Sequence, residues 1–344
     1  MSVSPALRIW LLVPLLFAAM LVSLLLGSVV ITPAAVARVL LPAAGIAPEV
    51  TEALDIARVV IREVRLPRVL LAVGAGAALG LAGLLMQTVF RNPLAGPGVL
   101  GVSAGAGLGV ALVVLSGVGG QLSSPAVVAA MAGAGAVVLV VMITHRVVDD
   151  PVILLVLGLL FGHAAGALTT LLMAASPAAG IERYVIWSFG SFALPPGIIQ
   201  PLLLFVVVVV SALLAFWGAR LDALLLGRAY AESSGVAARA LHGALLTVAG
   251  VLTGLVTAYT GPIAFLGVAV PHLARGYLQS SRHRLLVPAT ALCGATLAVL
   301  ADLLARMPWS ARVLPLNAVL ALVGVPVVLA VVIAPRRAGR GGGV

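Results

Sequence analysis

Long apolar segments recur along this chain, and short segments rich in arginine, glycine and proline separate them. A helix needs about 20 residues to cross the roughly 30 Å hydrocarbon core of a bilayer. Ten segments reach that length, so the pattern predicts an all-α polytopic membrane protein with about ten transmembrane helices in one domain, residues 1–344. We predict the spans near 8–28, 67–89, 98–116, 125–144, 152–174, 197–217, 239–259, 262–279, 286–304 and 313–334.

The polar connections predict how the chain lies in the membrane. An even number of spans puts both termini on one side of the membrane. Twelve of the twenty arginines lie on that side, which predicts that it is the cytoplasmic side. Segment 29–66 has mixed charges, which predicts an external amphipathic helix leading into the second span. Segment 218–240 is predicted to be cytoplasmic and mostly helical, with turns at Gly227 and Gly235, and residues 335–344 form a basic cytoplasmic tail.

Composition agrees with a lipid environment. Apolar residues make up 62% of the chain and charged residues 9%, too few to cover the surface of a soluble protein. The net charge of +10 comes from arginines at the ends of spans, where they anchor helices at anionic headgroups, so we give nucleic acid no role. The chain has no lysine, which excludes a phosphate-binding loop of the G-x-x-x-x-G-K type and Schiff-base chemistry.

Few residues suggest chemistry inside the membrane. Asp302 is the carboxylate within a predicted span and lies near its outer end, which disfavours an ion-coupled carrier. The single cysteine, Cys293, excludes an internal disulfide, and the histidines lack metal-ligand spacing. His163 lies in mid-span beside Gly162, where it either bonds to a neighbouring helix or contacts a transported ligand. The chain therefore indicates a helical transport unit driven by another protein.

Several long motifs resemble a known family. They are R-L-P-R at 65–68 with G-A-G-A-A-L-G-L-A-G-L-L-M-Q at 74–87, R-N-P-L-A-G-P-G-V-L-G-V-S-A-G-A at 91–106, G-P-I-A-F-L-G-V-A-V-P-H-L-A-R at 261–275, and A-D-L-L-A-R at 301–306. Together they make the chain similar to the FecCD-type permeases of type II ABC importers for iron-siderophores, haem and cobalamin. The resemblance covers nearly the whole chain.

The resemblance implies a permease in the cytoplasmic membrane that works by alternating access. Two permease subunits, identical or paralogous, would enclose a central path, two ATPase subunits would bind ATP and Mg²⁺, and an external binding protein would deliver the substrate. This chain itself would need no cofactor or metal and would not be an enzyme. We expect a ferric siderophore as substrate, with haem or cobalamin as alternatives. Outside this class, an ATP-independent secondary carrier or a structural subunit of a membrane complex would also fit the composition.

The same resemblance assigns roles to residues. It implies docking of the binding protein on Arg65, Arg68 and Arg306, although arginines there also suit headgroup anchors. It places ATPase coupling in 221–236, and it lines the translocation path with Gly158, Gly162 and His163. The coupling residues are Leu226, Gly227, Arg228, Ala231, Ser234 and Gly235, and the structural motif residues are Asn92, Pro93, Gly261, Pro262, Pro271, His272 and Arg275.

Some of these residues have simpler explanations, and a few positions depart from the family. Asn92-Pro93 and Gly261-Pro262 are plausible helix starts, and Pro271 would kink a helix either to shape a pore or to suit packing. R-V-L-P-L-N at 312–317, Arg228 and Ser234 replace residues that are common in the family. These departures would suit pairing with a non-identical partner.

Overall fold

The computed structural model describes residues 4–27, 29–40, 52–116, 124–148, 150–306 and 313–338, and in these residues the regular structure is entirely helical. Each of the ten predicted spans contains a helix, which confirms the all-helical fold class. These ten helices are α1 (Pro5–Leu25), α4 (Leu66–Phe90), α5 (Val102–Val114), α6 (Ser124–Val147), α7 (Pro151–Ala174), α9 (Ile199–Phe216), α12 (Ala238–Thr260), α13 (Leu266–Leu278), α14 (His283–Ala305) and α15 (Leu316–Ala338).

Within the described residues, seven helices are long and apolar enough to cross a membrane. The predicted spans at 98–116 and 262–279 are corrected, because α5 and α13 have only 13 residues each, or about 20 Å at 1.5 Å per residue. A 3₁₀ turn over Pro97–Leu100 and a left-handed Gly101 delay α5. Positive φ values of 73° at Gly261 and 66° at Phe265 delay α13.

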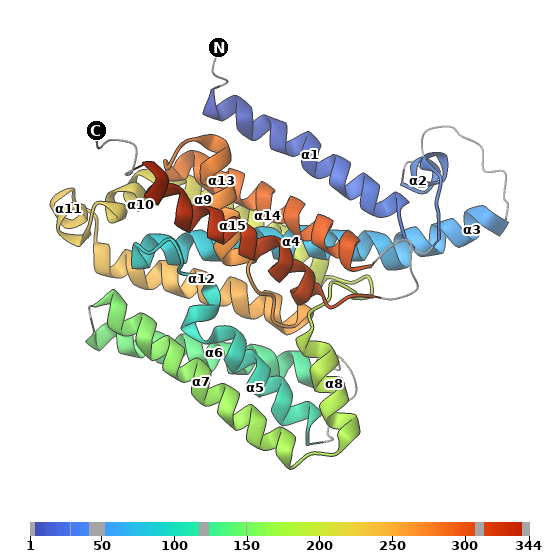
Figure 1. Cartoon of the computed structure of the whole chain (residues 1–344), viewed down its shortest axis with the longest axis horizontal. Helices are drawn as coiled ribbons and strands as arrows, with labels where there is room; N and C mark the ends of the chain where they lie inside the picture. The colour runs from blue at the N-terminus through green and yellow to red at the C-terminus, as the bar shows by residue number, and fades with distance from the viewer. Residues whose placement is uncertain are drawn as a thin grey trace.

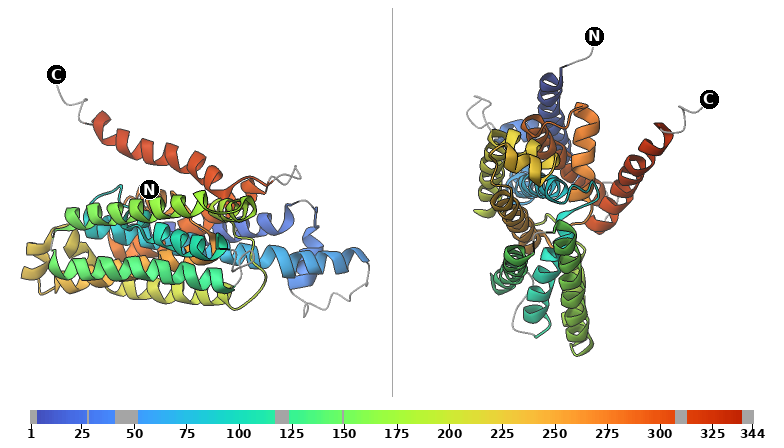
Figure 2. Two further views of the ribbon diagram at one scale, coloured as in Figure 1. Left: turned by 90° about the horizontal axis from the view of Figure 1, so that it is seen from below. Right: turned by 90° about the vertical axis from the view of Figure 1, so that its left-hand side faces the viewer.

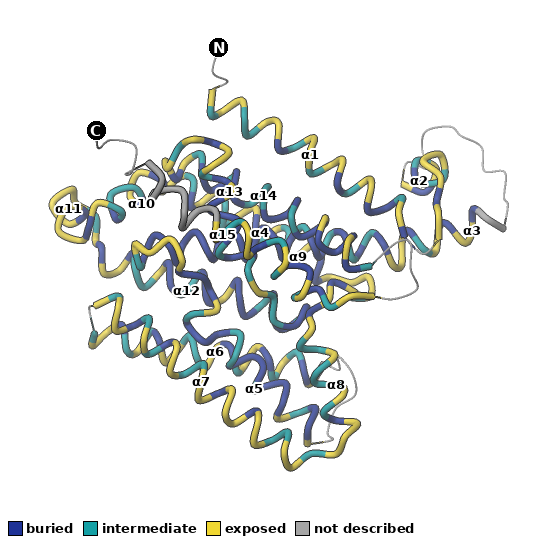
Figure 3. The backbone as a smooth tube through the Cα atoms, in the orientation of Figure 1, coloured by how far each residue is buried: buried dark blue, intermediate teal, exposed yellow. Residues whose placement is uncertain are grey.

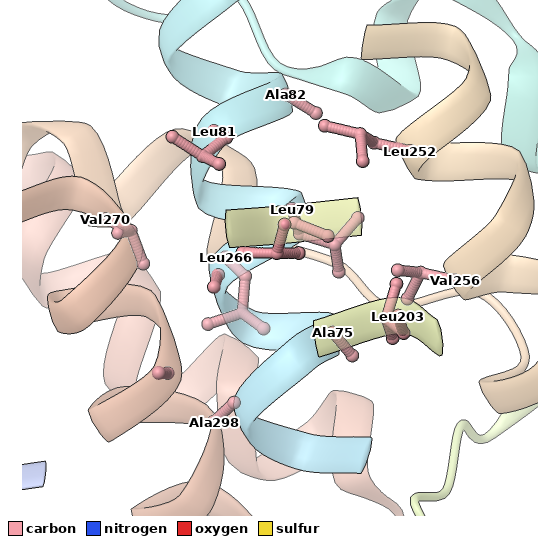
Figure 4. Packing of buried hydrophobic residues seen from close by; sticks show 14 of the residues in the cluster. Ala75, Leu79, Leu81, Ala82, Leu203, Leu252, Val256, Leu266, Val270 and Ala298 are labelled. Carbon is pink, nitrogen blue, oxygen red and sulfur yellow. The ribbon is translucent and has the colours of Figure 1, made fainter. Parts of the chain in front are cut away.

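Helix α4 lies at the centre of the larger group of helices, in contact with α9, α12, α13 and α14 (Figure 1). It is buried along almost its whole length, whereas its neighbours α9, α12 and α14 are buried to a smaller extent (Figure 3). Figure 4 shows α4 side chains between α9, α12, α13 and α14, with Leu79 among them. A Cβ atom added at Gly83 would lie 1.6 Å from the carbonyl oxygen of Gly267, so glycine is required for this backbone contact.

Helices α5, α6 and α7 form a second group, which joins the first through α12 (Figures 1 and 2). Its internal contact also depends on small residues. A Cβ added at Gly109 would lie 2.0 Å from the carbonyl oxygen of Ala129, and one added at Gly133 would lie 2.1 Å from that of Gly105. In lipid, where no hydrophobic drive holds helices together, such close backbone approach supplies the packing.

Short helices form the connections. The predicted external helix over 29–66 is corrected to α2 (Pro33–Leu40) and α3 (Glu52–Val59), and a π-helical turn over Val60–Arg65 joins α3 to α4. Part of that prediction, 41–51, lies outside the described residues. Segment 175–196 contains α8 (Ala178–Ser188), and 218–240 contains α10 (Gly218–Leu225) and α11 (Arg228–Ser233). Of the predicted tail, 335–338 continues α15, and 339–344 lies outside the described residues.

The two ends of the molecule differ. The start of α1 and the end of α15 lie toward the end that carries α10 and α11, while α2 and α3 lie at the opposite end (Figure 1). We call these the α10 end and the α3 end. Arg8 of α1 confirms the first placement, since it exchanges hydrogen bonds with Tyr277 at the close of α13.

Candidate functional site

At the α10 end, α10 packs against the body of the protein, and α11, which follows it, is largely exposed. Leu221 and Leu224 of α10 are fully buried, whereas Leu226 and Tyr230 are 67% and 51% exposed. Gly227 separates the two helices with a φ of 110°. This left-handed backbone favours glycine and lets the chain reverse direction. The sequence therefore predicted the turn correctly.

Helix α11 is anchored by one side chain and flanked by two pockets. Ala231 is fully buried, and its amide donates to the carbonyl of Gly227 at 3.0 Å. Gly235, with a φ of 79°, turns the chain from Ser234 toward α12. Pockets of about 690 and 440 Å³ lie on the two sides of the start of α12, and one of them contains Glu232.

A salt bridge within α11 explains one departure from the family. Arg228 donates from Nε to Glu232 Oε1 at 2.7 Å, one turn further along the helix. Both side chains are well exposed, so the pair contributes little to stability. Its effect is to present a basic and an acidic group together on one exposed face of α11.

Five of the seven family motif residues, Asn92, Pro93, Pro271, His272 and Arg275, lie at this same end, whereas Gly261 and Pro262 lie beside α8 and the start of α15. His272 bonds through Nε2 to the carbonyl of Pro93 at 2.7 Å, and Arg275 donates from Nη1 to Gln87 Oε1 at 2.5 Å. Asn92 accepts from the Leu94 amide at 2.9 Å, closing the turn after α4. The motifs at 91–106 and 261–275 are therefore in contact, and Pro271, buried within α13, packs inside this junction.

At the α3 end, one carboxylate holds two of the predicted docking arginines. Arg68 donates from Nε to both oxygens of Asp302, at 2.9 and 3.0 Å. Arg306 Nε lies 3.1 Å from Asp302 Oδ2, as an ion pair without hydrogen-bond geometry, and its Nη2 donates to Ser23 Oγ at 2.6 Å. Burial lowers the pKa of the Arg306 guanidinium from its ordinary value, and the Asp302 carboxylate opposes that shift.

The third predicted docking residue, Arg65, lies inside the protein. It is 4% exposed and donates to the carbonyls of Leu24, at 2.6 Å, and of Leu25 and Val29. Leu24 and Leu25 are the last two residues of α1 and Val29 follows that helix, so Arg65 caps α1 as a cation at its negative pole. All three arginines therefore have partners within the chain, and a docking role for them stays a prediction.

Asn317, at the start of α15, was singled out by sequence only as part of a departure from the family. Its amide nitrogen donates to the carbonyls of Pro262, at 2.7 Å, and Ser188, at 3.1 Å. Its side-chain oxygen accepts from the Ala264 amide at 3.0 Å. Asn317 thus joins α8, α15 and the loop that contains Gly261, where an added Cβ would lie 2.3 Å from the Trp187 carbonyl.

The predicted path residues on α7 divide between two faces. A Cβ added at Gly158 would lie 2.8 Å from both the carbonyl oxygen of Val99 and the Cα of Leu100, and Gly162 faces Gly101. These glycines therefore serve close packing against the turn before α5. His163 is exposed on the side of α7 that its own chain leaves uncovered. That side is accessible to a path or a second subunit, and the role of His163 stays a prediction.

Comparison with known proteins gives a consistent result. The model of the FecCD transport family matches residues 15–334. The vitamin B12 import system permease protein BtuC of Vibrio cholerae is 38% identical over 270 residues, which are 77% of this chain and 80% of that protein. BtuC of Escherichia coli is 33% identical over 278 residues, 80% of this chain and 84% of that protein.

A solved structure supports the same assignment. An inward-facing structure of a metal-chelate type ABC transporter is 27% identical and superposes with a TM-score of 0.82. The superposition covers 95% of this chain and 98% of that one. The helix order described above is therefore similar to that of an ABC importer permease over nearly its full length.

Proposed function

This chain belongs to the FecCD transport family, and from that premise we propose that it imports a metal chelate along a path between two permease subunits. It is the permease subunit of an ABC importer, a multi-pass protein of the cell membrane, and it is not an enzyme. Such a permease works with ATPase and binding-protein partners. ATP and Mg²⁺ then bind to the ATPase, and this chain transmits the resulting movement.

The proposed cargo is an intact metal chelate. The observation that supports this proposal is the similarity of the chain to permeases that are named for such cargoes. The relatives in Vibrio cholerae and Escherichia coli are named for vitamin B12, a cobalt chelate. The superposed structure is of a metal-chelate type transporter. These names favour cobalamin over the ferric siderophore that the sequence motifs suggested. Cobalamin and ferric siderophores are both organic chelates of a metal ion.

We propose that the α10 end is cytoplasmic and that α11 contacts the ATPase. Three features support this placement. Leu226 and Tyr230 are exposed although apolar, two pockets flank the segment, and the buried Ala231 anchors it to the body. Arg146 and Arg239 also lie at this end, where the Arg239 guanidinium donates to the Arg146 carbonyl, and arginines are favoured on the cytoplasmic side.

We propose that the α3 end is external and receives the binding protein. Arg68 and Arg306 share the single carboxylate of Asp302, so the cluster keeps an excess positive charge even with both arginines paired. An acidic partner surface would be steered toward that excess. Association of the binding protein should then slow as salt is raised, and an association rate independent of salt would contradict this docking site.

The cargo can be tested by direct uptake. The assembled transporter, in proteoliposomes containing ATP, is offered radiolabelled cobalamin in one sample and a radiolabelled ferric hydroxamate siderophore in another, each with its binding protein. We expect ATP-dependent accumulation of cobalamin that unlabelled cobalamin suppresses. Accumulation of the siderophore instead would reverse the order of the two cargoes, and accumulation of neither would contradict the metal-chelate proposal.

A further inference from the structure

A chain of hydrogen bonds connects α10 to the centre of the protein. Asp222 of α10 accepts from His283 Nδ1 at 2.6 Å and from the His283 backbone amide at 3.0 Å. The other ring nitrogen, Nε2, lies 2.8 Å from the Thr88 hydroxyl of α4. Because His283 begins α14, these hydrogen bonds join α4, α10 and α14 at one point.

This series of hydrogen bonds is continuous in either protonation state of His283. Asp222 accepts from Nδ1, so that nitrogen carries a proton. If Nε2 carries none, the Thr88 hydroxyl donates to it. If His283 carries both protons, Nε2 donates to the Thr88 hydroxyl, which then donates to the carbonyl of Leu84, 2.8 Å away. In either form hydrogen bonds connect Asp222 to His283 and His283 to Thr88.

The surroundings make this point rigid. His283 and Thr88 are fully buried, so neither can exchange its partner for water. The Asp222 carboxylate also lies at the N-terminus of α14, where negative charge stabilises a helix. Beside it, a Cβ added at Gly218 of α10 would lie 2.8 Å from the Arg284 amide, so α10 and α14 are in direct backbone contact.

We propose that Asp222, His283 and Thr88 are positioning residues that transmit movement of the ATPase-facing loop to α4 and α14. The inference rests on the proposed function, in which α11 contacts the ATPase. Gly227 bonds to both short helices, since its amide donates to the Leu224 carbonyl of α10 and its carbonyl accepts from the Ala231 amide of α11, so movement of α11 reaches α10. Helix α10 in turn contacts the body through the buried Leu221 and Leu224 and through Asp222. A displacement of α10 then acts on α14 through Asp222 and on α4 through His283 and Thr88.

The adjacent residue on α4 supports this arrangement. Gln87 accepts from Arg275 and donates to the carbonyl of Val268, both on α13. Gln87 and Thr88, near the end of α4, therefore bind α13 and α14 in turn. Both of these helices pack against α4. Movement delivered at Thr88 would shift α4 against both.

The test compares ATP hydrolysis with uptake in the same proteoliposomes, using the complete transporter. Thr88→Val keeps the shape of the side chain and removes the hydroxyl. Thr253→Val in α12 is the matched control, because Thr253 is 1% exposed and its hydroxyl donates to the carbonyl of Ala249 one turn earlier. The probe is whichever of radiolabelled cobalamin and the radiolabelled ferric hydroxamate siderophore the wild type imports.

We expect Thr88→Val to keep hydrolysing ATP while importing about five- to tenfold less probe per ATP, the effect of losing about one buried hydrogen bond. Thr88→Ser, which restores the hydroxyl, should recover the wild-type ratio. Asp222→Asn, which keeps an acceptor oxygen but loses the charge, should give an intermediate ratio. Thr253→Val should leave the ratio unchanged.

Three results would overturn the inference. The first is a wild-type ratio of uptake to hydrolysis in Thr88→Val. The second is an equal fall in Thr253→Val, which would indicate a general packing effect. The third is loss of assembled complex with an unchanged ratio in the complex that remains, which would make the chain of hydrogen bonds an element of folding only. Failure of the wild type to hydrolyse ATP with its partner would contradict the proposed function instead.

Discussion

Asp302 should contribute more to stability than any exposed carboxylate on the described surface, because two half-buried arginines depend on it. Asp302→Asn keeps the shape and one acceptor oxygen but removes the charge. The side chains of Arg68 and Arg306 are 13% and 12% exposed, and that of Asp302 is 1% exposed. Removing one partner of a buried ion pair costs about 3–5 kcal/mol.

The expected loss is somewhat smaller than that range. Water reaches part of each guanidinium, and the asparagine oxygen still accepts one hydrogen bond from Arg68. We therefore expect Asp302→Asn to lower the free energy of unfolding by about 2–4 kcal/mol, since a charged hydrogen bond and one buried counter-charge are lost. The same change at Asp55 is the control, because Asp55 and Arg58 are 4.0 Å apart and more than half exposed.

Denaturation of the purified permease by sodium dodecyl sulphate in mixed micelles, followed by circular dichroism, measures both variants. Asp55→Asn should change the free energy of unfolding by about 1 kcal/mol or less, as exposed pairs do. If Asp302→Asn costs no more than Asp55→Asn, the two arginines do not depend on Asp302, and the account of this cluster is wrong.

Three further predictions follow from particular contacts. Gly83→Ala should destabilise the purified permease in the same denaturation assay by about 1–3 kcal/mol or more through overpacking, whereas Gly135→Ala, with open space at its Cβ, should not. Ala231→Pro removes the amide that bonds within α11 and should abolish ATP-driven uptake; unchanged uptake would contradict the coupling site. His163→Cys, with Cys293 replaced, should react with a small aqueous thiol reagent in at least one nucleotide state, and protection in every state would assign His163 to a packed interface.

Hydrophobic length predicted the helices well, because an apolar segment of about 20 residues has few alternatives in lipid. It overestimated the length of α5 and α13. At α13 the positive φ of Gly261 falls on a glycine, but the φ of 66° at Phe265 has no such signal in the sequence. The short helices on either side of Gly227 were also predictable, since a glycine between two polar segments is a local signal.

Long-range polar pairs were beyond the sequence. Arg68 and Asp302 are 234 residues apart, and Thr88 and His283 are 195 apart, so no spacing rule connects them. Asp302 in particular seemed a lone carboxylate at a span end. The arginines of the predicted docking site were located correctly at span ends, but their internal partners depend on how α1, α4 and α14 pack together.

The central claim is that this chain forms the path of an ATP-driven importer, and the energy source of uptake tests it most directly. Proteoliposomes with the complete transporter are loaded with ATP, with a non-hydrolysable analogue, or with no nucleotide, and radiolabelled cobalamin and the ferric hydroxamate siderophore are supplied outside. We predict accumulation of one probe against its gradient with ATP alone. Equal accumulation without nucleotide, driven by an imposed proton or sodium gradient, would contradict the claim and identify a secondary carrier.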